Sequence, residues 1–156
     1  MNHTIHLGDN LEVLRAMPDE SVDLIYIDPP FNTGRRQDRK RISVQEVTGD
    51  DSGDRTGFQG KRYRTTEVAG AGYADTFDDF MGFLVPRLEE ARRLLTPTAS
   101  FFLHIDYRES HYCKVALDEI FGRDCFQNEI IWAYDYGGRS KKKWSAKHDN
   151  IFWYTR

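Results

Sequence analysis

Cysteine is scarce in this sequence, and long apolar runs are missing. The 156 residues include only two cysteines, Cys113 and Cys125, whose spacing fits no metal site, redox motif or disulfide framework. We expect both to be buried thiols in a reducing cytoplasm. No apolar run approaches the roughly 20 residues that cross a bilayer, and the first residues lack the charged and apolar regions of a signal peptide. The sequence therefore predicts a soluble, cytoplasmic protein with no membrane partner.

A strong excess of one charge is also missing, although cations are clustered. The net charge is −3 at pH 7, which argues against general binding to polyanions. Two runs nevertheless concentrate positive charge. The first run contains Arg35, Arg36, Arg39, Lys40 and Arg41, and the second contains Arg139, Lys141, Lys142 and Lys143. Each run is either a solvated loop or a surface that binds phosphate.

Chain length and apolar patterning predict a single domain over 1–156 with α/β architecture. The predicted strands are 5–7, 24–28, 100–105, 129–132 and 151–154. A helix over about 77–95 is predicted from apolar residues that are three or four positions apart, with a kink or a break at Pro86. From 35 to 73 apolar residues are sparse and no period appears, which predicts an irregular, mobile loop.

Two further helices are predicted from capping-box patterns, in which an acid at the N-cap is followed three residues later by a glutamate. One pattern pairs Asp9 with Glu12. The other pairs Asp106 with Glu109 and opens a helix that is expected to end at Gly122.

The most informative segment is Asp28-Pro29-Pro30-Phe31. It follows the apolar run 24–27, which predicts a buried parallel strand, and proline cannot extend the ladder beyond it. Ligands of open α/β sheets bind beyond the carboxyl ends of the strands, so a site is expected at this segment. A carboxylate, two proline carbonyl groups and an aromatic ring are suited to holding a planar base by its amino group. Alternatively, Asp28 caps a neighbouring amide and Phe31 fills part of the core.

A set of motifs, in a fixed order, resembles the amino-terminal half of β-class DNA amino-methyltransferases. The motifs are GDNLEVL, LIYIDPPFNTG, YADTF, RRLLTP, SFFLHIDYRESHY, LDEIFG, NEIIW and KHDNIFWYT. The resemblance covers nearly the whole chain apart from 35–68. It implies a Rossmann-like sheet, S-adenosylmethionine as cofactor and methylation of an exocyclic amine in double-stranded DNA, within a restriction-modification system. The acid that begins DPPF is typical of the adenine-N6 type, whereas the cytosine-N4 type more often has serine there.

The resemblance also implies roles for individual residues. The catalytic motif is Asp28, Pro29, Pro30 and Phe31. The Asp28 carboxylate and the Pro29 carbonyl oxygen accept hydrogen bonds from the amine, and Phe31 stacks on the base after it leaves the helix. These bonds favour a pyramidal nitrogen whose lone pair points at the methyl group, so no base has to remove a proton first. Asp9 and Asp28 are the candidate cofactor-binding residues, although Asp9 also fits a helix cap. The two cation runs are the candidate DNA-binding residues.

Other polar and aromatic residues are expected to have structural roles. His104 and Asp106 lie on one face at a strand end and resemble part of a metal site, but no third ligand accompanies them. Packing and capping are therefore expected for this pair, and no metal is expected in the protein. Trp132 and Trp153 are expected in the core. Lys147-His148-Asp149 resembles a signature of the same family, and sequence reasoning assigns it no role.

One feature of the family is missing. β-class enzymes place a glycine-rich cofactor loop of the F-x-G-x-G type after the segment that ends here, and no such motif follows a strand in these residues. The resemblance therefore predicts an incomplete catalytic domain that is inactive by itself and binds S-adenosylmethionine weakly or not at all. A carboxyl-terminal half, or a second copy in a homodimer, is expected to pair with the open edge of the strand at 24–28.

Three functions are consistent with these features. The first is an adenine-N6 DNA methyltransferase, and the second is a cytosine-N4 DNA methyltransferase. The third is a non-catalytic chain that binds DNA or accompanies an enzyme. A protein-methylating relative is less favoured, because those relatives have NPPY where this sequence has DPPF.

Overall fold

The computed structural model describes residues 3–47, 53–137 and 140–156. The chain forms two compact units, one made of residues 1–33 and 77–156 and the other of residues 34–76. Residues 34–76 are therefore an insertion in the sequence of the larger unit, and they form a unit of their own within the predicted single domain. No described helix has both the length and the apolar composition that a membrane span needs.

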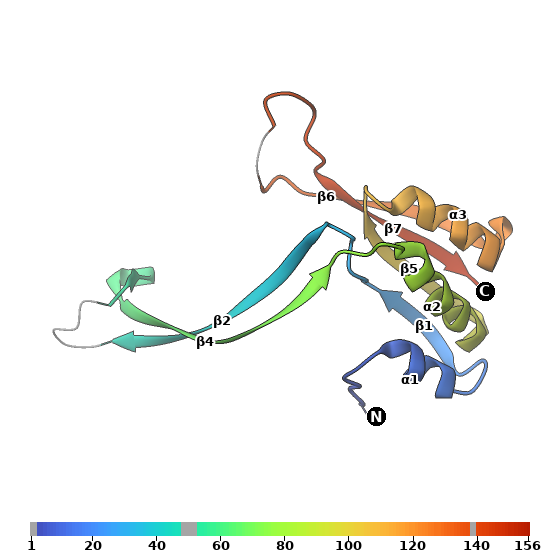
Figure 1. Cartoon of the computed structure of the whole chain (residues 1–156), viewed down its shortest axis with the longest axis horizontal. Coiled ribbons are helices and arrows are strands. Elements are labelled where there is room, and N and C mark those ends of the chain that lie inside the picture. Colours follow the sequence, from blue (N-terminus) through green and yellow to red (C-terminus); the bar gives the residue numbers. More distant parts are fainter. Residues whose placement is uncertain (1–2, 48–52, 138–139) are drawn as a thin grey trace. The chain divides into compact units, whose positions relative to one another are not determined.

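The larger unit is built on a mixed four-stranded sheet with the strand order β1-β5-β7-β6 (Figure 1). Strand β1 (Val22–Ile27) pairs in parallel with β5 (Leu95–Asp106). Strand β7 (His148–Thr155) runs antiparallel both to β5 and to β6 (Phe126–Ala133). These strands confirm the predicted α/β class and four of the five predicted strands.

The described residues form three α-helices, α1 (Asn10–Ala16), α2 (Phe80–Leu94) and α3 (Ser110–Phe121). Asp9 caps α1, as predicted, by accepting a hydrogen bond from the amide two residues later. Helix α2 begins after its N-cap Asp79 and continues without a break through Pro86. Helix α3 is followed by Gly122, which has a φ of 95°. A residue with a side chain would be strained at this angle, whereas glycine is not. The predicted end of this helix is therefore confirmed.

Two local predictions are wrong. Residues 5–7 lie outside any strand, and the side chains of Ile5 and Leu7 are fully exposed. A run of three residues forms a strand only where it can pair with the edge of a sheet. The capping box predicted at Asp106 is also absent, because that carboxylate accepts a hydrogen bond from the Arg108 amide (2.9 Å) and forms an ion pair with the Arg108 guanidinium. Helix α3 consequently begins later, at Ser110.

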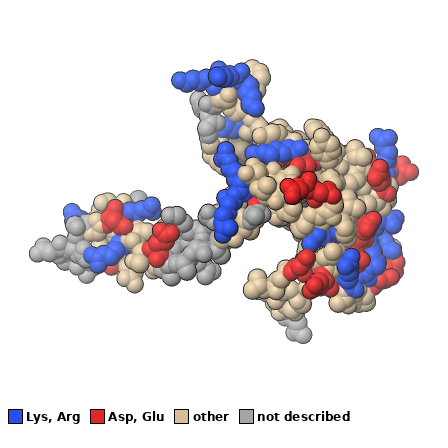
Figure 2. All heavy atoms as spheres, in the orientation of Figure 1, with Lys and Arg blue, Asp and Glu red and all other residues tan. Residues whose placement is uncertain are grey.

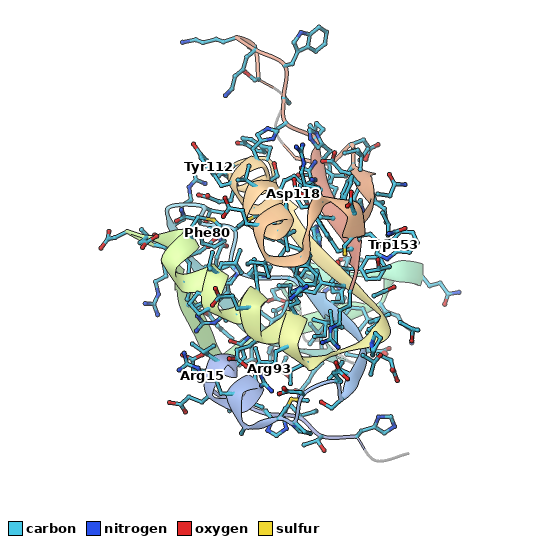
Figure 3. The ribbon with its side chains drawn as sticks, turned by 90° about the vertical axis from the view of Figure 1, so that its right-hand side faces the viewer. Arg15, Phe80, Arg93, Tyr112, Asp118 and Trp153 are labelled. Carbon is cyan, nitrogen blue, oxygen red and sulfur yellow. The ribbon has the colours of Figure 1, made fainter. Side chains whose placement is uncertain are left out.

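Helices α2 and α3 lie side by side over one face of the sheet (Figure 3). Side chains from these helices and from the two central strands form the hydrophobic core. Five of its members, each at most 1% exposed, are Leu84, Leu88, Leu103, Leu117 and Tyr154. The strand residues among them alternate along their strands with residues of the opposite face, as the pleat requires.

The opposite face of the sheet is largely uncovered by the described residues. Leu24, Tyr26, Ile130 and Trp132 share this face according to the strand register, and each is between 43% and 60% exposed. Sheets of α/β proteins usually bury both faces. This apolar face is therefore the part of the larger unit with the least covering.

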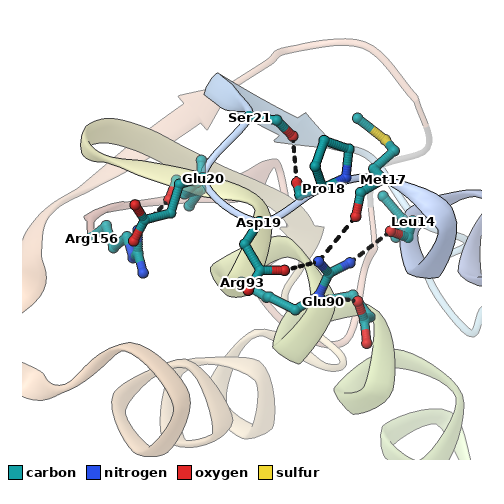
Figure 4. Close-up of polar contacts among 10 residues, drawn as sticks. Leu14, Met17, Pro18, Asp19, Glu20, Ser21, Glu90, Arg93 and Arg156 are labelled. Carbon is teal, nitrogen blue, oxygen red and sulfur yellow. Dashed lines mark hydrogen bonds and ion pairs between the residues drawn. The ribbon is translucent and has the colours of Figure 1, made fainter.

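The turn that precedes β1 is fixed to the end of α2 by Arg93 (Figure 4). Its guanidinium donates hydrogen bonds to the main-chain oxygens of Leu14 (2.9 Å) and Met17 (3.0 Å). It also bonds to Glu90 (2.7 Å) and forms an ion pair with Asp19. Main-chain hydrogen bonds from the same turn to α2 add to this anchor. Because β1 follows the turn directly, the anchor holds the start of the strand that leads to the candidate site.

The smaller unit is a long antiparallel hairpin, so the prediction of an irregular loop over 35–73 is wrong. Strand β2 (Arg35–Val47) pairs with β4 (Arg62–Asp75), which also pairs with the short β3 (Arg55–Thr56). A 3₁₀ turn (Phe58–Gly60) precedes β4. The prediction fails for a physical reason: a two-stranded ribbon has no buried face, so its sequence needs no apolar alternation.

The core predicts a contrast between two truncations. We expect Leu88→Ala, which empties a site with 0% exposure, to lower the free energy of unfolding by about 2–5 kcal/mol. The control Val115→Ala removes a side chain that is 59% exposed on α3, and it should change that free energy by less than about 0.5 kcal/mol. Urea denaturation followed by circular dichroism measures both values. Equal effects of the two substitutions would contradict the assigned core.

Candidate active site

The candidate site forms where β1 and β5 run side by side towards the same edge of the sheet. In their parallel register Ile27 pairs with Leu103, so that Asp28 comes next to His104. The two prolines that follow Asp28 prevent the ladder from continuing along this strand. The DPPF motif therefore lies at the carboxyl end of the strand, where the sequence predicts a site.

A cavity of about 590 Å³ opens beside Asp28. It is lined by β1, by the prolines of the motif, by the start of α1 and by α2; the polar lining residues include Asp9, Asp28 and Arg87. The Asp28 side chain is 58% exposed, and its Oδ1 lies 3.8 Å from His104 Nδ1, which is too long for a hydrogen bond. The Asp28 carboxylate is therefore not enclosed in a tight ion pair, and an incoming donor can reach it.

Asp9 reaches the same cavity from the start of α1. Its Oδ1 accepts hydrogen bonds from the Leu11 amide (2.9 Å) and from Arg87 Nη2 (2.8 Å). Arg87 also donates to Asn10 Oδ1 (2.8 Å) and lies 3.8 Å above the ring centre of Phe83. The hydrogen bond from the Leu11 amide has the largest effect on Asp9 and, together with Arg87, holds the pKa of this carboxyl below its usual value although desolvation acts in the opposite direction. Asp9 is therefore an anionic acceptor at neutral pH. The cap is confirmed, and the cofactor role remains a prediction.

His104 is buried beside the motif, and both of its ring nitrogens face polar groups. Nδ1 lies 3.0 Å from the Tyr26 hydroxyl, and Nε2 lies 3.4 Å from Asp149 Oδ2. The imidazole stacks on Trp132 with ring centres 5.5 Å apart and 15° between the planes, and the Phe31 ring is centred 5.4 Å away. Phe31 thus packs partly against protein, as one of its two predicted roles requires. Sequence reasoning placed His104 in the core but missed these contacts near the motif.

Asp149 connects His104 with the loop between β6 and β7. Tyr134 donates a hydrogen bond to Asp149 Oδ1 (3.2 Å). Burial, followed by the charge of Asp149, raises the pKa of Tyr134, so its hydroxyl remains a protonated donor. Asp149 is the acid of the KHD signature, to which sequence reasoning assigned no role. The KHD signature was therefore the feature of the sequence that pointed to Asp149.

Asn32 fixes the chain directly after the motif. Its amide nitrogen donates to Glu109 Oε1 (2.8 Å), and its amide oxygen accepts from the Phe77 main-chain N–H (3.0 Å). The φ of Asn32 is 55°, in the left-handed region that asparagine tolerates better than most residues. One side chain thus ties the end of the motif to the segments that lead into α2 and α3.

Of the predicted DNA-binding residues, Lys141, Lys142 and Lys143 are exposed on the loop between β6 and β7. Figure 2 shows cationic side chains gathered there. The next residue, Trp144, is 97% exposed. Lys147 closes the base of this loop by donating hydrogen bonds to three main-chain oxygens of the opposite limb. Among its described residues the loop therefore presents three exposed lysines and two exposed aromatic rings, Tyr136 and Trp144, to the solvent.

The other predicted cations lie in the smaller unit or outside the described residues. Arg35 and Arg36 are exposed at the beginning of β2 in the smaller unit. Residues 39–41 belong to β2, but their side chains lie outside the described part of the chain. Arg139 is outside the described residues altogether.

Comparison with known proteins decides the family. The N6/N4 methyltransferase family model, described as a DNA methylase, matches residues 22–156. The chain belongs to this DNA methylase family. The match includes the DPPF motif, His104 and Asp149, whereas Asp9 precedes it.

Individual relatives agree with this assignment. This DNA methylase chain is 32% identical to the Mod subunit of the type III restriction-modification enzyme EcoP15I of Escherichia coli, and 28% identical to the type II methyltransferase M.KpnI of Klebsiella pneumoniae. The alignments cover 99% and 98% of this chain but only 24% and 32% of those relatives. The chain therefore spans about a quarter to a third of the length of these curated relatives.

A solved structure shows the same fold. The PvuII DNA methyltransferase (cytosine-N4-specific) superposes with a TM-score of 0.58 and 14% sequence identity, over 96% of this chain and 48% of that chain. At this identity the likeness shows the fold alone. It confirms the predicted methyltransferase-like sheet.

In this methylase chain the two tryptophans that were predicted in the core, Trp132 and Trp153, differ in their exposure. Trp132 is 55% exposed, so its prediction as a core residue is wrong, although one face of its ring stacks on His104. Trp153 is partly buried and stacks on Phe102 with ring centres 5.7 Å apart. Within the described residues no group of three candidate metal ligands occurs, and the polar groups near His104 include Tyr26, Asp28 and Asp149.

The role of Asn32 can be tested by two substitutions. Both Asn32→Ala and Asn32→Gly remove the hydrogen bonds to Glu109 and Phe77, and each should lower the free energy of unfolding by about 1–3 kcal/mol. Glycine also tolerates the positive φ, so the glycine variant should be the more stable of the two. Urea denaturation measures the difference. A glycine variant as stable as the wild type would show that the two hydrogen bonds contribute little.

Proposed function

We propose that the protein transfers a methyl group from S-adenosylmethionine to the exocyclic N6 amine of an adenine in double-stranded DNA. Membership of the DNA methylase family supports the reaction class. The motif Asp28-Pro29-Pro30-Phe31 supports adenine, because its first residue is the acid typical of the adenine-N6 type. The observation that carries the proposal is the half-exposed Asp28 carboxylate, which borders a cavity at the end of a strand.

Asp28 and the Pro29 carbonyl oxygen are the proposed acceptors for the two hydrogens of the amine. An aromatic amine is a weak nucleophile because its lone pair is delocalised into the ring. Two acceptors at fixed positions favour a pyramidal nitrogen and stabilise the positive charge that develops on it during transfer. Proline suits this task because its ring fixes φ and therefore limits the movement of the segment.

The cavity is the proposed cofactor site. Its volume of about 590 Å³ falls within the roughly 300–1,000 Å³ of typical small-molecule sites. Asp9 at the mouth is an anionic acceptor that suits the amine or hydroxyl groups of an adenosine, while Ile25, Phe83 and Leu84 supply apolar walls. Bound S-adenosylmethionine supplies an electrophilic methyl group. The residues of this chain bind the adenosine part, exclude water and hold the target amine at Asp28.

The loop between β6 and β7 is the proposed DNA contact within the larger unit. Lys141, Lys142 and Lys143 offer three charges to backbone phosphates. An exposed tryptophan beside cations is a common stacking platform for bases, and Trp144 has this environment. Arg35 and Arg36 are proposed to add phosphate contacts from the smaller unit, as are residues 39–41 and Arg139.

The catalytic role of Asp28 can be tested with Asp28→Asn, which keeps the shape of the side chain and removes its charge. We expect the single-turnover rate of methyl transfer to fall about 10²–10³-fold, because the stabilisation of the developing charge is lost. Binding of DNA should be nearly unchanged. The full-length protein, tritiated S-adenosylmethionine and duplex DNA are used, with the exposed Asp124→Asn on another segment as the matched control.

The product identifies the target base. Mass spectrometry of the nucleosides should show N6-methyladenine. N4-methylcytosine would instead establish the cytosine-specific alternative. If Asp28→Asn transfers methyl groups as fast as the wild type, a catalytic role for the motif is excluded, and the non-catalytic DNA-binding alternative is favoured.

The DNA contact can be tested through its salt dependence. Replacing Lys141, Lys142 and Lys143 together by glutamine should weaken DNA binding at every sequence. It should also reduce the slope of log K against log salt concentration by up to about 3. Fluorescence anisotropy of labelled duplex DNA measures both quantities. The control Arg92→Gln removes an exposed cation from α2, and an equal loss of slope in that variant would show that the loop is not a specific contact.

A further inference from the structure

The imidazole of His104 lies between two carboxylates, and the proposed reaction uses only one of them. Its Nδ1 faces Asp28 Oδ1 at 3.8 Å, and its Nε2 faces Asp149 Oδ2 at 3.4 Å. The side chains of His104 and Asp149 are only 11% and 17% exposed, whereas that of Asp28 is 58% exposed. A buried histidine and a partly buried carboxylate therefore lie behind the carboxylate that borders the cavity.

The neighbours of His104 determine which nitrogen carries its proton. An ionised Asp149 can only accept a hydrogen bond, so the neutral ring donates from Nε2 and keeps a lone pair on Nδ1. Burial, and then the charge of Asp28, raises the pKa of Tyr26, so the Tyr26 hydroxyl remains protonated and donates to that lone pair. Nδ1 is thus a proton acceptor that points towards Tyr26 and Asp28.

We propose that His104, oriented by Asp149, takes over the proton that Asp28 receives from the newly methylated amine. His104 acts through Asp28 and is in this sense a positioning residue, because it returns Asp28 to its carboxylate form. The inference rests on the proposed function and adds a route for the proton that methyl transfer must release.

Methyl transfer releases one proton, which passes through Asp28 to His104. The amine nitrogen forms a bond to the methyl carbon while the bond between that carbon and the sulfonium sulfur of S-adenosylmethionine breaks, and the electron pair of the broken bond stays on sulfur. The nitrogen is then cationic, and it loses one proton to the Asp28 carboxylate, which restores its lone pair. Protonated Asp28 passes this proton to Nδ1 of His104, so the imidazole becomes a cation and Asp28 becomes an anion again.

The groups around His104 favour this end state. Asp28, directly after β1, and Asp149 from β7 place a negative charge on each side of the imidazolium. Tyr134 supports Asp149 through its hydrogen bond. The stacked Trp132 ring offers its face to the cation. The transfer itself needs Asp28 to approach Nδ1 by less than 1 Å, or it passes through the Tyr26 hydroxyl at 3.0 Å from that nitrogen.

Three variants of the full-length protein test the proposal. Asp149→Asn removes the orienting charge and keeps the shape of the side chain. His104→Asn keeps a polar group, and His104→Ala leaves space for added imidazole. The exposed His111→Gln on α3 is the matched control. Steady-state methyl transfer, in which Asp28 must return to its carboxylate form before each new turnover, is measured over a range of pH, together with equilibrium DNA binding and thermal unfolding.

The expected result is a loss of rate with binding retained. At neutral pH the transfer rate should fall at least about tenfold in all three variants, in keeping with the usual effect of a proton acceptor. The pH profile of the rate should change in Asp149→Asn and stay unchanged in His111→Gln, because only Asp149 contacts the proposed proton acceptor. Added imidazole should increase the rate of His104→Ala in proportion to its concentration and leave the wild type and His111→Gln unchanged.

Two outcomes would overturn the proposal, and they can be told apart. If the wild type transfers methyl groups and the variants lose activity only in proportion to their loss of folded protein, with an unchanged pH profile and no effect of imidazole, His104 has a structural role alone. If the wild type itself binds DNA without transferring any methyl group, the proposed function fails and this inference fails with it.

Discussion

The parallel pairing of β1 with β5 is the constraint on which the rest of the site depends. Because Ile27 pairs with Leu103, the chain leaves the sheet at Asp28 directly beside His104. The two prolines make that exit abrupt, and they prevent the ladder from absorbing Asp28 as another strand residue. A shift of one residue in this register would turn Asp28 to the opposite face and separate it from its present neighbours. This pairing therefore determines where the cavity and His104 lie relative to Asp28.

Helix α2 supports this geometry from its middle and from its C-terminal end. Near its middle, Arg87 holds Asp9 at the cavity, and near its end Arg93 holds the turn that enters β1. Each guanidinium serves several main-chain or side-chain acceptors, which a lysine ammonium cannot match in a planar arrangement. The antiparallel strand β7 completes the support from the other side, because its register brings Asp149 to the face that carries His104. The site is therefore held by long-range pairings between segments far apart in the sequence.

The sequence predicted those elements whose residues carry their own signal. The apolar run before Asp28, the periodic helix that became α2 and the glycine after α3 each depend on local chemistry, and the structure confirms the parallel strand, the helix and the helix end. The predicted burial of that strand is wrong, because none of the residues of β1 is fully buried. The hairpin of β2 and β4 was missed because an exposed ribbon leaves no apolar pattern. The contacts of His104 were missed for another reason. They depend on strand register, and no local pattern shows that residues 26, 104 and 149 lie together.

The central claim is that Asp28 and the main chain of Pro29 hold the amine of an extruded adenine. A crystal structure of the full-length protein with duplex DNA and a non-reactive analogue of S-adenosylmethionine tests this claim most directly. We expect an adenine outside the helix, with its amino nitrogen within about 2.7–3.2 Å of both an Asp28 carboxylate oxygen and the Pro29 carbonyl oxygen. A complex in which the extruded base binds elsewhere, with Asp28 bonded only to protein groups, would contradict it.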